Sequence, residues 1–268
     1  MQIQDRVFVV TGGGNGIGRE VVLQLLARGA RVAAVDLSES GLAETAGLAA
    51  AGDRLSLHAA SITDRAAVDA LPAAVQAAHG QVDGVLNVAG IIQHFVPVSE
   101  LGHDEIARVM DVNFWGVVNV TKAFLPLLLA RPEAALVNVS SMGALVPVPG
   151  QSAYGASKAA VKLFTEGLYA ELHDGPVAVT IVFPGGVATN ITGNSGVEMA
   201  IDPEAARRAS SRLTSAPDAG RQLVEAVERG TVRLRIGSDA RMLDRLSRLM
   251  PVRAILTVAR QMKAMTGG

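Results

Sequence analysis

Short apolar segments and longer helical patterns alternate along the whole chain, and this alternation constrains the fold more than any other feature. Most of the short segments are apolar throughout, which is typical of strands buried on both faces. The predicted strands are Arg6–Thr11, Arg31–Asp36, Leu55–Ala59, Asp83–Asn87, Ala134–Ser140, Val177–Val182 and Val232–Ile236. The predicted helices are Gly16–Arg28, Gly41–Ala51, Asp64–His79, Asp104–Ala130, Ala153–His173 and Asp218–Arg229. This order predicts a Rossmann-type, doubly wound α/β fold, with helices on both faces of a parallel sheet of about seven strands.

Length and composition fit one globular domain followed by a short extension. The chain has 268 residues, of which 49% are hydrophobic and 18% charged, and this supplies ample apolar surface for a core. We expect residues 1–240 to form a single dinucleotide-binding catalytic domain. It includes an irregular segment, 185–217, whose length and position after a strand are typical of a binding loop. Residues 241–268 form a separate basic, amphipathic extension.

Charge and residue usage exclude several classes of function. The formal net charge is −1, so there is no general electrostatic reason to bind nucleic acid. Cysteine is absent, which excludes disulfides and thiolate metal sites, and the scattered histidines have no ligand spacing, so we predict no metal. No secretory pattern and no uninterrupted apolar run of about 18 residues occurs. We therefore expect a cytoplasmic protein without a membrane-spanning helix.

A glycine-rich turn follows the first predicted strand. It reads Thr11-Gly12-Gly13-Gly14-Asn15-Gly16-Ile17-Gly18 and leads into the first helix. Glycines in this context let the backbone approach a pyrophosphate, whose charge then faces the positive end of the helix dipole. A glycine cluster alone is equally compatible with a tight turn. The dinucleotide prediction therefore also depends on residues further along the chain.

Asp36 favours NAD over NADP. It ends the second predicted strand, where a carboxylate accepts both ribose hydroxyls of NAD and would repel the 2′-phosphate of NADP. Its neighbours Asn15, Leu37 and Ser38 supply no cation that would reverse the preference. If Asp36 were only a helix cap, the absence of basic neighbours would have no explanation.

Tyr154 and Lys158 lie one helical turn apart, so both side chains leave the same face of the predicted helix. A free tyrosine has a pKa near ~10, and a nearby ammonium together with a positive nicotinamide ring would lower it toward neutrality. Ser141 follows a buried strand, and we expect its hydroxyl to bind the substrate oxygen at the same edge of the sheet. A Tyr–Lys pair alone is usually an ordinary surface pair. Beside a dinucleotide turn it indicates hydride transfer.

Asn113 interrupts the long apolar pattern of the helix predicted over 104–130. A mid-helix asparagine is unfavourable unless its side chain has a specific partner. We expect a local kink that holds a water for proton relay. The alternative is a core amide whose hydrogen bonds are satisfied within the protein.

Several motifs in this order resemble the short-chain dehydrogenase/reductase family over nearly the whole chain. Gly12, Gly16 and Gly18 match its TGxxxGxG turn, and the tetrad Asn113, Ser141, Tyr154 and Lys158 matches its catalytic residues. The resemblance implies that Asn87-Val88-Ala89-Gly90 is the NNAG segment, with Val88 replacing the second Asn. It also implies that 184–189, Pro-Gly-Gly-Val-Ala-Thr, is the PGxxxT segment near the nicotinamide carboxamide.

The resemblance extends to further residues and to assembly. It implies that Ser61 and Ile62 lie near the adenine, where many members carry an Asp, and that helices 104–130 and 153–173 build a homodimer or homotetramer. The chain end differs from that of the acyl-carrier reductases, which argues against fatty-acid synthesis. The full predicted cofactor set is Gly12, Asn15, Gly16, Ile17, Gly18, Asp36, Ser61, Ile62, Asn87, Ala89, Gly90, Tyr154, Lys158, Pro184, Gly185, Val187 and Thr189.

The expected substrate is an apolar secondary alcohol or its ketone, because Met142, Val146, Val148 and the 185–217 loop supply few charged contacts. The predicted substrate contacts are Gln93, His94, Met142, Gln151 and Gly186. Two alternatives are a membrane-recruited lipid or 3-oxoacyl reductase and a non-catalytic nucleotide sensor. The intact tetrad argues against the sensor.

The basic extension has apolar residues at helical spacing between Met242 and Met265, with arginines between them. This pattern predicts an amphipathic helix, broken or bent near Pro251. Residues 241–268 contain six basic residues and one acid, a net charge of +5. Packing on the protein body or a partner subunit is the favoured interpretation. A lid over an apolar pocket and peripheral contact with an anionic membrane are the alternatives.

Overall fold

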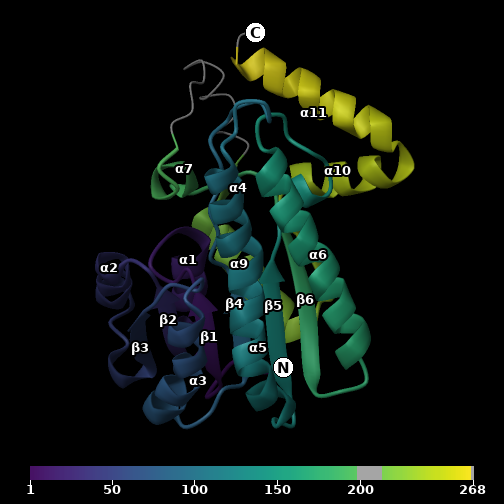
Figure 1. Ribbon diagram of the computed structural model, residues 1–268. Coiled ribbons are helices and arrows are strands. Elements are labelled where there is room, and N and C mark those ends of the chain that lie inside the picture. Colours follow the sequence, from purple (N-terminus) through teal and green to yellow (C-terminus); the bar gives the residue numbers. More distant parts are fainter. Residues whose placement is uncertain (198–212, 267–268) are drawn as a thin grey trace.

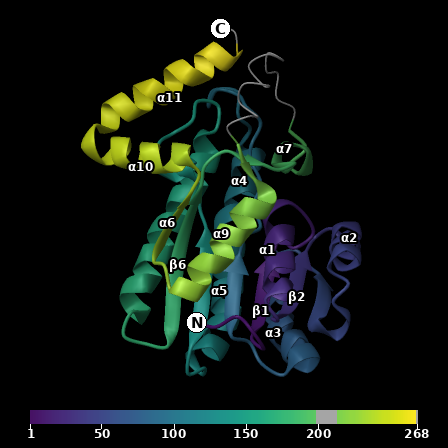
Figure 2. The same ribbon diagram turned by 180° about the vertical axis from the view of Figure 1, so that it is seen from behind.

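The computed structural model describes residues 1–197 and 213–266 and contains a seven-stranded parallel sheet with helices on both faces (Figures 1 and 2). The strand order is β3-β2-β1-β4-β5-β6-β9. The order reverses between β1 and β4, and ligands of open α/β sheets bind at such a point, beyond the carboxyl ends of the strands. The predicted Rossmann-type, doubly wound fold is therefore confirmed.

Each predicted strand and helix has a counterpart in the structure, although several ends differ. The strands of the large sheet are β1 (Val7–Thr11), β2 (Arg31–Asp36), β3 (Leu55–Ala59), β4 (Gly84–Asn87), β5 (Ala134–Val139), β6 (Val177–Pro184) and β9 (Arg233–Ile236). The main helices are α1 (Gly16–Ala27), α2 (Glu39–Ala49), α3 (Arg65–His79), α4 (His103–Met110), α5 (Gly116–Leu129), α6 (Ser152–Leu172), α9 (Ala216–Arg229), α10 (Ser238–Leu249) and α11 (Pro251–Thr266). Helix α2 begins before the predicted Gly41 because the Ser38 hydroxyl accepts a hydrogen bond from the Gly41 amide at 3.0 Å and caps the helix.

Two hydrophobic layers hold the helices to the sheet, one on each face. Strand β1 is buried along its whole length, and alternate residues face opposite layers. Phe8 and Val10 pack with α1 and α9, which lie together on one face (Figure 2). Val7 and Val9 pack with α3, α5 and α6 on the other (Figure 1). This double burial explains why the central strands are largely apolar.

The helix predicted over 104–130 is not a single regular helix. A π-helical segment, Asp111–Trp115, separates α4 from α5, and its buried Asn113 is the residue at which the sequence predicts a kink. By length and composition, the run His103–Leu129 could cross a membrane. Val120, Phe124 and Leu128 are instead fully buried against the sheet, as in the core helix of a globular domain.

The loop predicted over 185–217 contains short elements of its own. Strand β7 (Val187–Ala188) pairs with β8 (Thr214–Ser215), and helix α7 (Ile191–Asn194) lies between them. The remaining part of the predicted binding loop, residues 198–212, lies outside the described residues.

The basic extension forms two helices that meet at Pro251, as the sequence predicts. Helix α10 begins at Ser238, before the predicted start at Met242, so the expected division between residues 240 and 241 falls within it. Buried Asp244 ties α10 to β9 through Arg233 at 2.9 Å and Arg235 at 3.1 Å. The extension is therefore anchored to the sheet at its first helix.

Candidate active site

The glycine turn and the segment after β4 are joined at the carboxyl edge of the sheet. The Thr11 hydroxyl accepts hydrogen bonds from the amides of Val88 at 3.1 Å and Ala89 at 3.3 Å. Gly12 has a φ of +74°, and a Cβ there would lie 3.0 Å from the Ala89 Cα. A side chain at Gly18 would overlap the carbonyl of Gly12. The turn is thus compact enough that only glycine fits where the predicted motif requires it.

Asp36 faces the same turn. Its carboxylate accepts hydrogen bonds from the amides of Gly14 and Ser38, both at 2.9 Å. Arg19, a cation that is not among the predicted site residues, also lies at this turn. Arg19, directly after the last glycine, donates to the Gly14 carbonyl and to Thr45 at 3.1 Å, and pairs with Glu44 at 2.7 Å. A glycine motif followed by arginine is the signal that could have identified it.

The remaining residues predicted around the cofactor have different environments. Ser61 is partly exposed, and its hydroxyl lies 2.8 Å from that of Thr63. The backbone carbonyl of buried Ile62 accepts a hydrogen bond from Asn119 at 3.1 Å. Ile17 packs against the hydrophobic layer beneath the turn. Gly16 lies close to Thr189: a Cβ added to the glycine would be 3.5 Å from the threonine methyl group.

Asn87 is a scaffold residue within the sheet. Its side chain donates to Asn138 of β5 at 2.8 Å, and Asn138 in turn donates to Thr165 of α6 at 2.9 Å. Because this series of hydrogen bonds is buried, it fixes β4, β5 and α6 relative to one another. The Asn87 side-chain oxygen is buried without a protein partner.

Tyr154 and Lys158 lie on α6, beside Ser141 at the end of β5. Partial burial raises the pKa of the Tyr154 phenol, and a hydrogen bond from Ser141 offsets part of this effect. Lys158 is buried, donates to the Val139 carbonyl at 3.1 Å, and has its pKa lowered by burial to about 8. The protein groups by themselves therefore do not give Tyr154 the lowered pKa that the sequence predicts. Burial raises the pKa of the phenol by more than Ser141 lowers it.

Asn113 joins the π-helical segment to this cluster. Its side chain bonds both backbone groups of Ile91 at 2.9 Å and donates to the Ser157 hydroxyl at 3.0 Å. Ser157 donates to the Tyr154 carbonyl at 2.7 Å. A Cβ on Gly90 would lie 2.9 Å from the Lys158 ammonium nitrogen, so any side chain there would displace the ammonium. The helix is therefore distorted at Asn113, and the Asn113 amide also has its hydrogen bonds satisfied within the protein. The water for proton relay stays a prediction.

Gln93 has a different role from the predicted one. It is fully buried, and its side-chain oxygen accepts hydrogen bonds from the amides of Ala153 at 2.8 Å and Tyr154 at 3.0 Å. Its nitrogen donates to the Gly150 carbonyl at 2.9 Å, and its own carbonyl accepts from buried Gln151 at 2.7 Å. The Gln93 side chain thus has protein partners at both ends, whereas the side-chain oxygen of Gln151 is buried without one. Together the two glutamines hold the first turn of α6.

Two other predicted substrate contacts are also held by the protein. His94 is half exposed and binds Glu105 of α4 at 2.7 Å. The Gly186 amide donates to the Asp239 carboxylate at 2.7 Å. A side chain at Gly185 would overlap Asp239, and one at Gly186 would overlap Leu213. Asp239 was missed by sequence reasoning, because no local pattern links it to a segment 53 positions away.

Helix α7 and the residue after it contact the glycine turn and the segment after β4. Asn194 donates to the Asn15 side chain at 2.8 Å, and the Ser195 hydroxyl accepts from the Ile92 amide at 3.0 Å. These hydrogen bonds tie the end of α7 to the glycine turn and to the segment after β4. Met142 packs against the cluster that contains Val146 and Leu243.

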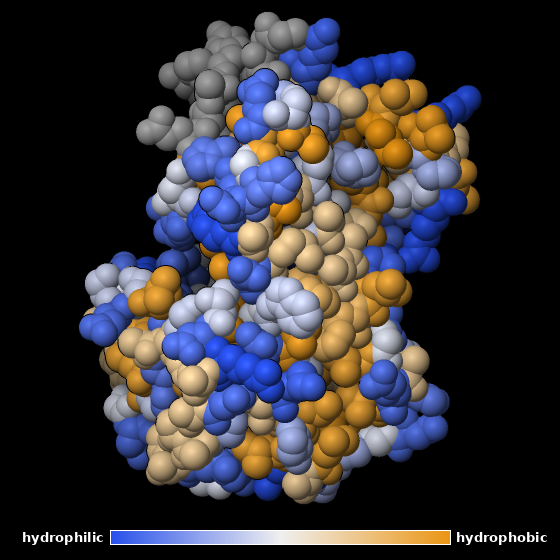
Figure 3. All heavy atoms as spheres, in the orientation of Figure 1, coloured by the Kyte–Doolittle hydropathy of each residue, from blue (hydrophilic) through white to orange (hydrophobic). Residues whose placement is uncertain are grey.

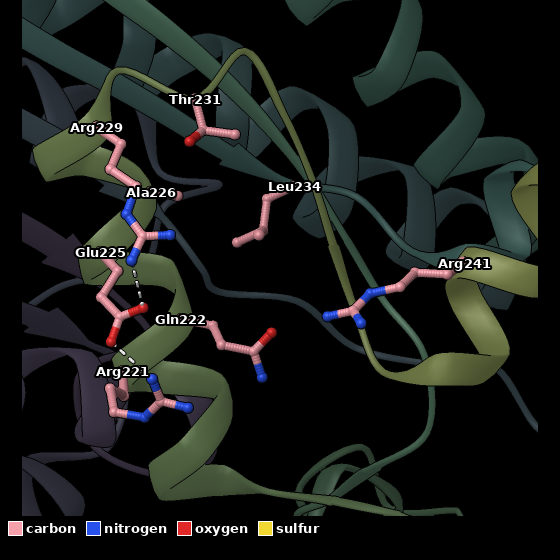
Figure 4. A pocket seen from close by; sticks show the side chains of 8 residues that line it. All are labelled: Arg221, Gln222, Glu225, Ala226, Arg229, Thr231, Leu234 and Arg241. Atoms are coloured by element: carbon pink, nitrogen blue, oxygen red, sulfur yellow. Dashed lines mark hydrogen bonds and ion pairs between the residues drawn. The ribbon is translucent and has the colours of Figure 1, made fainter.

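A separate cavity of about 380 Å³ lies on another part of the surface (Figure 4). It is lined by Arg221, Gln222, Glu225, Ala226, Arg229, Thr231, Leu234 and Arg241. Its walls come from α9, β9 and α10, and none of the predicted site residues lines it. Among the described residues no cluster of histidine and carboxylate side chains could hold a metal ion.

Sequence comparison identifies related proteins. The family profile described as short chain dehydrogenase matches residues 6–199. The Mycobacterium tuberculosis protein named "Putative oxidoreductase SadH" is 40% identical over 255 residues, which cover 92% of this chain and 91% of that protein. The similarity therefore extends into the basic extension.

Comparison of structures gives the same result. A short chain dehydrogenase/reductase from Burkholderia phymatum in complex with NAD has a TM-score of 0.84 at 27% identity, covering 95% of this chain and 97% of that one. A short chain dehydrogenase from Burkholderia cenocepacia in complex with NADP has a TM-score of 0.80 at 27% identity, covering 96% and 99%. Proteins with this fold thus bind either dinucleotide.

Proposed function

This chain belongs to the short chain dehydrogenase family of oxidoreductases, and we propose that it transfers a hydride between NAD(H) and a secondary alcohol or its ketone. One observation carries the proposal. The Ser141 hydroxyl lies beside the Tyr154 ring, since an added Cβ at Gly143 would be 3.5 Å from the Ser141 oxygen and 3.6 Å from the ring, and Lys158 lies one turn further along the same helix. These groups lie at the carboxyl edge of the sheet, on which the glycine turn also opens.

The residues present fit a dinucleotide. The turn over 12–18 leaves no room for side chains at Gly12 and Gly18, which lets its backbone approach a pyrophosphate. Asp36 would hold the adenosine ribose, and Lys158 the nicotinamide ribose. When bound, the nicotinamide supplies or accepts the hydride.

NAD is the proposed cofactor rather than NADP. The Asp36 carboxylate is oriented by two backbone amides beside the turn, where it would repel a 2′-phosphate. Arg19, a cation beside the same turn, is already bonded to Glu44, Thr45 and the Gly14 carbonyl. Recruiting it to a phosphate would break these contacts.

The chain's own groups provide the proton chemistry. In the oxidative direction Tyr154 accepts the hydroxyl proton as the carbon–oxygen double bond forms, and in the reductive direction it returns that proton to the oxygen. The Ser141 hydroxyl would bind the substrate oxygen. The Lys158 ammonium would stabilise the phenolate, and with a pKa of about 8 it is mostly protonated at neutral pH. Asn113 and Ser157 hold the first turn of α6 in place.

An apolar substrate is proposed from the surroundings of Ser141. Met142, Leu145, Val146 and Val148 follow it and pack with α10 and α11, so this wall presents mainly hydrocarbon. A lipid or 3-oxoacyl ketone could pack against the same apolar side chains and is the alternative substrate class. Both classes use the same proton donor.

We also propose a cytoplasmic homodimer or homotetramer that assembles through α5 and α6. Trp115, just before α5, is 52% exposed, Leu163 is 70% exposed and Tyr169 is 41% exposed. Apolar surface extends over α5 and α6 (Figure 3). Burying such a patch in a subunit contact removes apolar area from water.

A spectrophotometric screen tests the proposed activity. Purified protein is mixed with NADH or NADPH and with ketones of graded size and polarity, including 3-oxoacyl thioesters, and loss of reduced cofactor is followed. We expect NADH-dependent turnover that increases with the apolar character of the ketone. NADPH-only turnover would contradict the cofactor assignment, and turnover confined to polar ketones would contradict the substrate assignment.

A further inference from the structure

Helices α10 and α11, residues 238–266, form a hairpin at the carboxyl edge of the sheet (Figures 1 and 2). We call this unit the C-terminal hairpin. One face of α11 packs on the protein. Ala254 and Val258, four residues apart, are buried against Val146 and Leu243. The hairpin is thus anchored by one stripe of small and branched side chains.

A second apolar stripe on α11 faces outward. Val252 is 66% exposed, Ile255 is 43% exposed and Leu256 is 48% exposed, and their spacing places them on one side of the helix. Leu249, at the end of α10, is 78% exposed beside this stripe. Hydrophobic colour gathers over the hairpin in the space-filling view, next to hydrophilic side chains (Figure 3). A soluble monomer rarely leaves such a continuous apolar group in water.

The same surface carries an excess of positive charge. Residues 245–268 contain five basic residues and no Asp or Glu. Arg253 and Arg260 are exposed and lie three residues before and four residues after Leu256, so they border the apolar stripe. No described carboxylate forms an ion pair with Arg245, Arg253 or Arg260. Unpaired cations next to exposed aliphatic side chains are typical of interfacial helices.

We propose that the C-terminal hairpin binds the surface of an anionic lipid bilayer. The aliphatic side chains of α11 would enter the acyl boundary, and the arginines beside them would contact the lipid phosphates. A second copy of this chain fits less well. A two-fold contact through this face would place the arginines of one protomer against those of the other. The charge of the hairpin therefore favours an acidic partner, and its exposed aliphatic stripe favours a lipid one.

Docking in this way would bring the substrate side of the enzyme to the membrane. The buried stripe of α11 contacts Val146, which belongs to the segment that follows Ser141. An apolar ketone dissolved in the bilayer would then have a short path to Tyr154. This consequence depends on the proposed function, whereas membrane binding itself does not.

Sedimentation with lipid vesicles tests the proposal on the full-length protein. The vesicles contain either phosphatidylcholine alone or a mixture with phosphatidylglycerol, and the bound fraction is measured at low and high salt. Two double variants remove one property each: Val252→Ser with Leu256→Ser, and Arg253→Gln with Arg260→Gln. Leu48→Ser with Arg65→Gln is the matched control, because Leu48 is 60% exposed on α2 and the Arg65 side chain is 79% exposed on α3.

We expect binding to the anionic vesicles only, weakened by salt. Each lost arginine should reduce affinity about fivefold at low salt, the effect of one basic residue near an anionic surface. The serine variant should also lose binding, while the control variant binds as the wild type does. Equal binding by all variants, or no binding to anionic vesicles, would overturn the proposal. If the serine variant instead lowers the molecular mass in solution, the stripe is a contact between copies of this chain.

Discussion

The side-chain oxygen of Gln93 accepts a hydrogen bond from the backbone amide of Tyr154 at 3.0 Å. It accepts a second from the amide of Ala153 at 2.8 Å. The first amides of a helix have no partner within the helix, and no other side chain caps α6. A residue 61 positions away thus fixes the turn that presents the phenol. Gln93 is a positioning residue for Tyr154.

Replacing Gln93 with leucine should impair turnover more than cofactor binding. The variant leaves two helix amides without an acceptor, which should lower the free energy of unfolding by about 1–3 kcal/mol. It should also reduce kcat about tenfold while the Kd for NADH changes little. Gln93→Glu keeps the acceptor and should recover part of the lost kcat. Gln76→Leu, at an exposed position of α3, is the control. If kcat were unaffected in Gln93→Leu, the positioning role would be wrong.

Changing Asp36 to alanine should relax the preference for NADH. The ribose contact and the repulsion of a 2′-phosphate are lost together. Adding Glu44→Gln should move the preference further toward NADPH, because it releases Arg19 from an ion pair of 2.7 Å. The readout is the ratio of kcat/KM for the two cofactors. Glu39→Gln, at another exposed carboxylate of α2, should not have this additional effect. An unchanged ratio in Asp36→Ala would remove the basis for assigning NAD.

The buried ammonium of Lys158 should make stability depend on pH. Its pKa falls from 10.5 to about 8 on burial, so between these values the unfolded chain binds more protons than the folded one. The contribution of Lys158 to stability should therefore rise with pH in this window. From pH 8 to 10 the wild type should gain about 2–3 kcal/mol relative to Lys158→Met in denaturant unfolding. Lys122→Met, at an exposed site, should show no such divergence. A constant difference would mean that the lysine titrates normally.

Asp244→Asn should loosen the attachment of the C-terminal hairpin. Asp244 is 2% exposed and forms ion pairs with Arg233, Arg235 and Arg248. Removing the carboxylate leaves Arg233, beside Phe183, with Glu166 as its remaining ion-pair partner, at a cost of about 3 kcal/mol. The melting temperature should fall measurably. Asp53→Asn, at a carboxylate that is 86% exposed, should leave it unchanged. Equal melting temperatures would place the anchor elsewhere.

The sequence predicts those features whose cause is local. Alternating apolar segments define the sheet, and Pro251 marks the break between α10 and α11. An isolated asparagine within an apolar helix indicates the distortion found at Asn113. Each of these depends on a short stretch of chain, so periodicity and residue type are sufficient to find it.

Features that depend on distant contacts could not be predicted. Nothing near Gln93 indicates that it caps α6, because its partners belong to a helix that begins some 60 residues later. Asp239 likewise holds the Gly186 amide across the sheet edge. The pKa of Tyr154 depends on how deeply the fold buries it, and sequence spacing alone predicts only the charge of its neighbours. Burial and long-range hydrogen bonds come from the tertiary structure.

Turnover and cofactor binding of Tyr154→Phe, measured side by side, test the central claim most directly. The phenylalanine variant keeps the ring and loses the hydroxyl that exchanges the proton. NADH binding is followed by its fluorescence and turnover by NADH consumption with the best ketone from the screen. We predict a fall in turnover of ~10²-fold or more with an unchanged Kd for NADH. Turnover close to that of the wild type would contradict the assignment of Tyr154 as the proton donor.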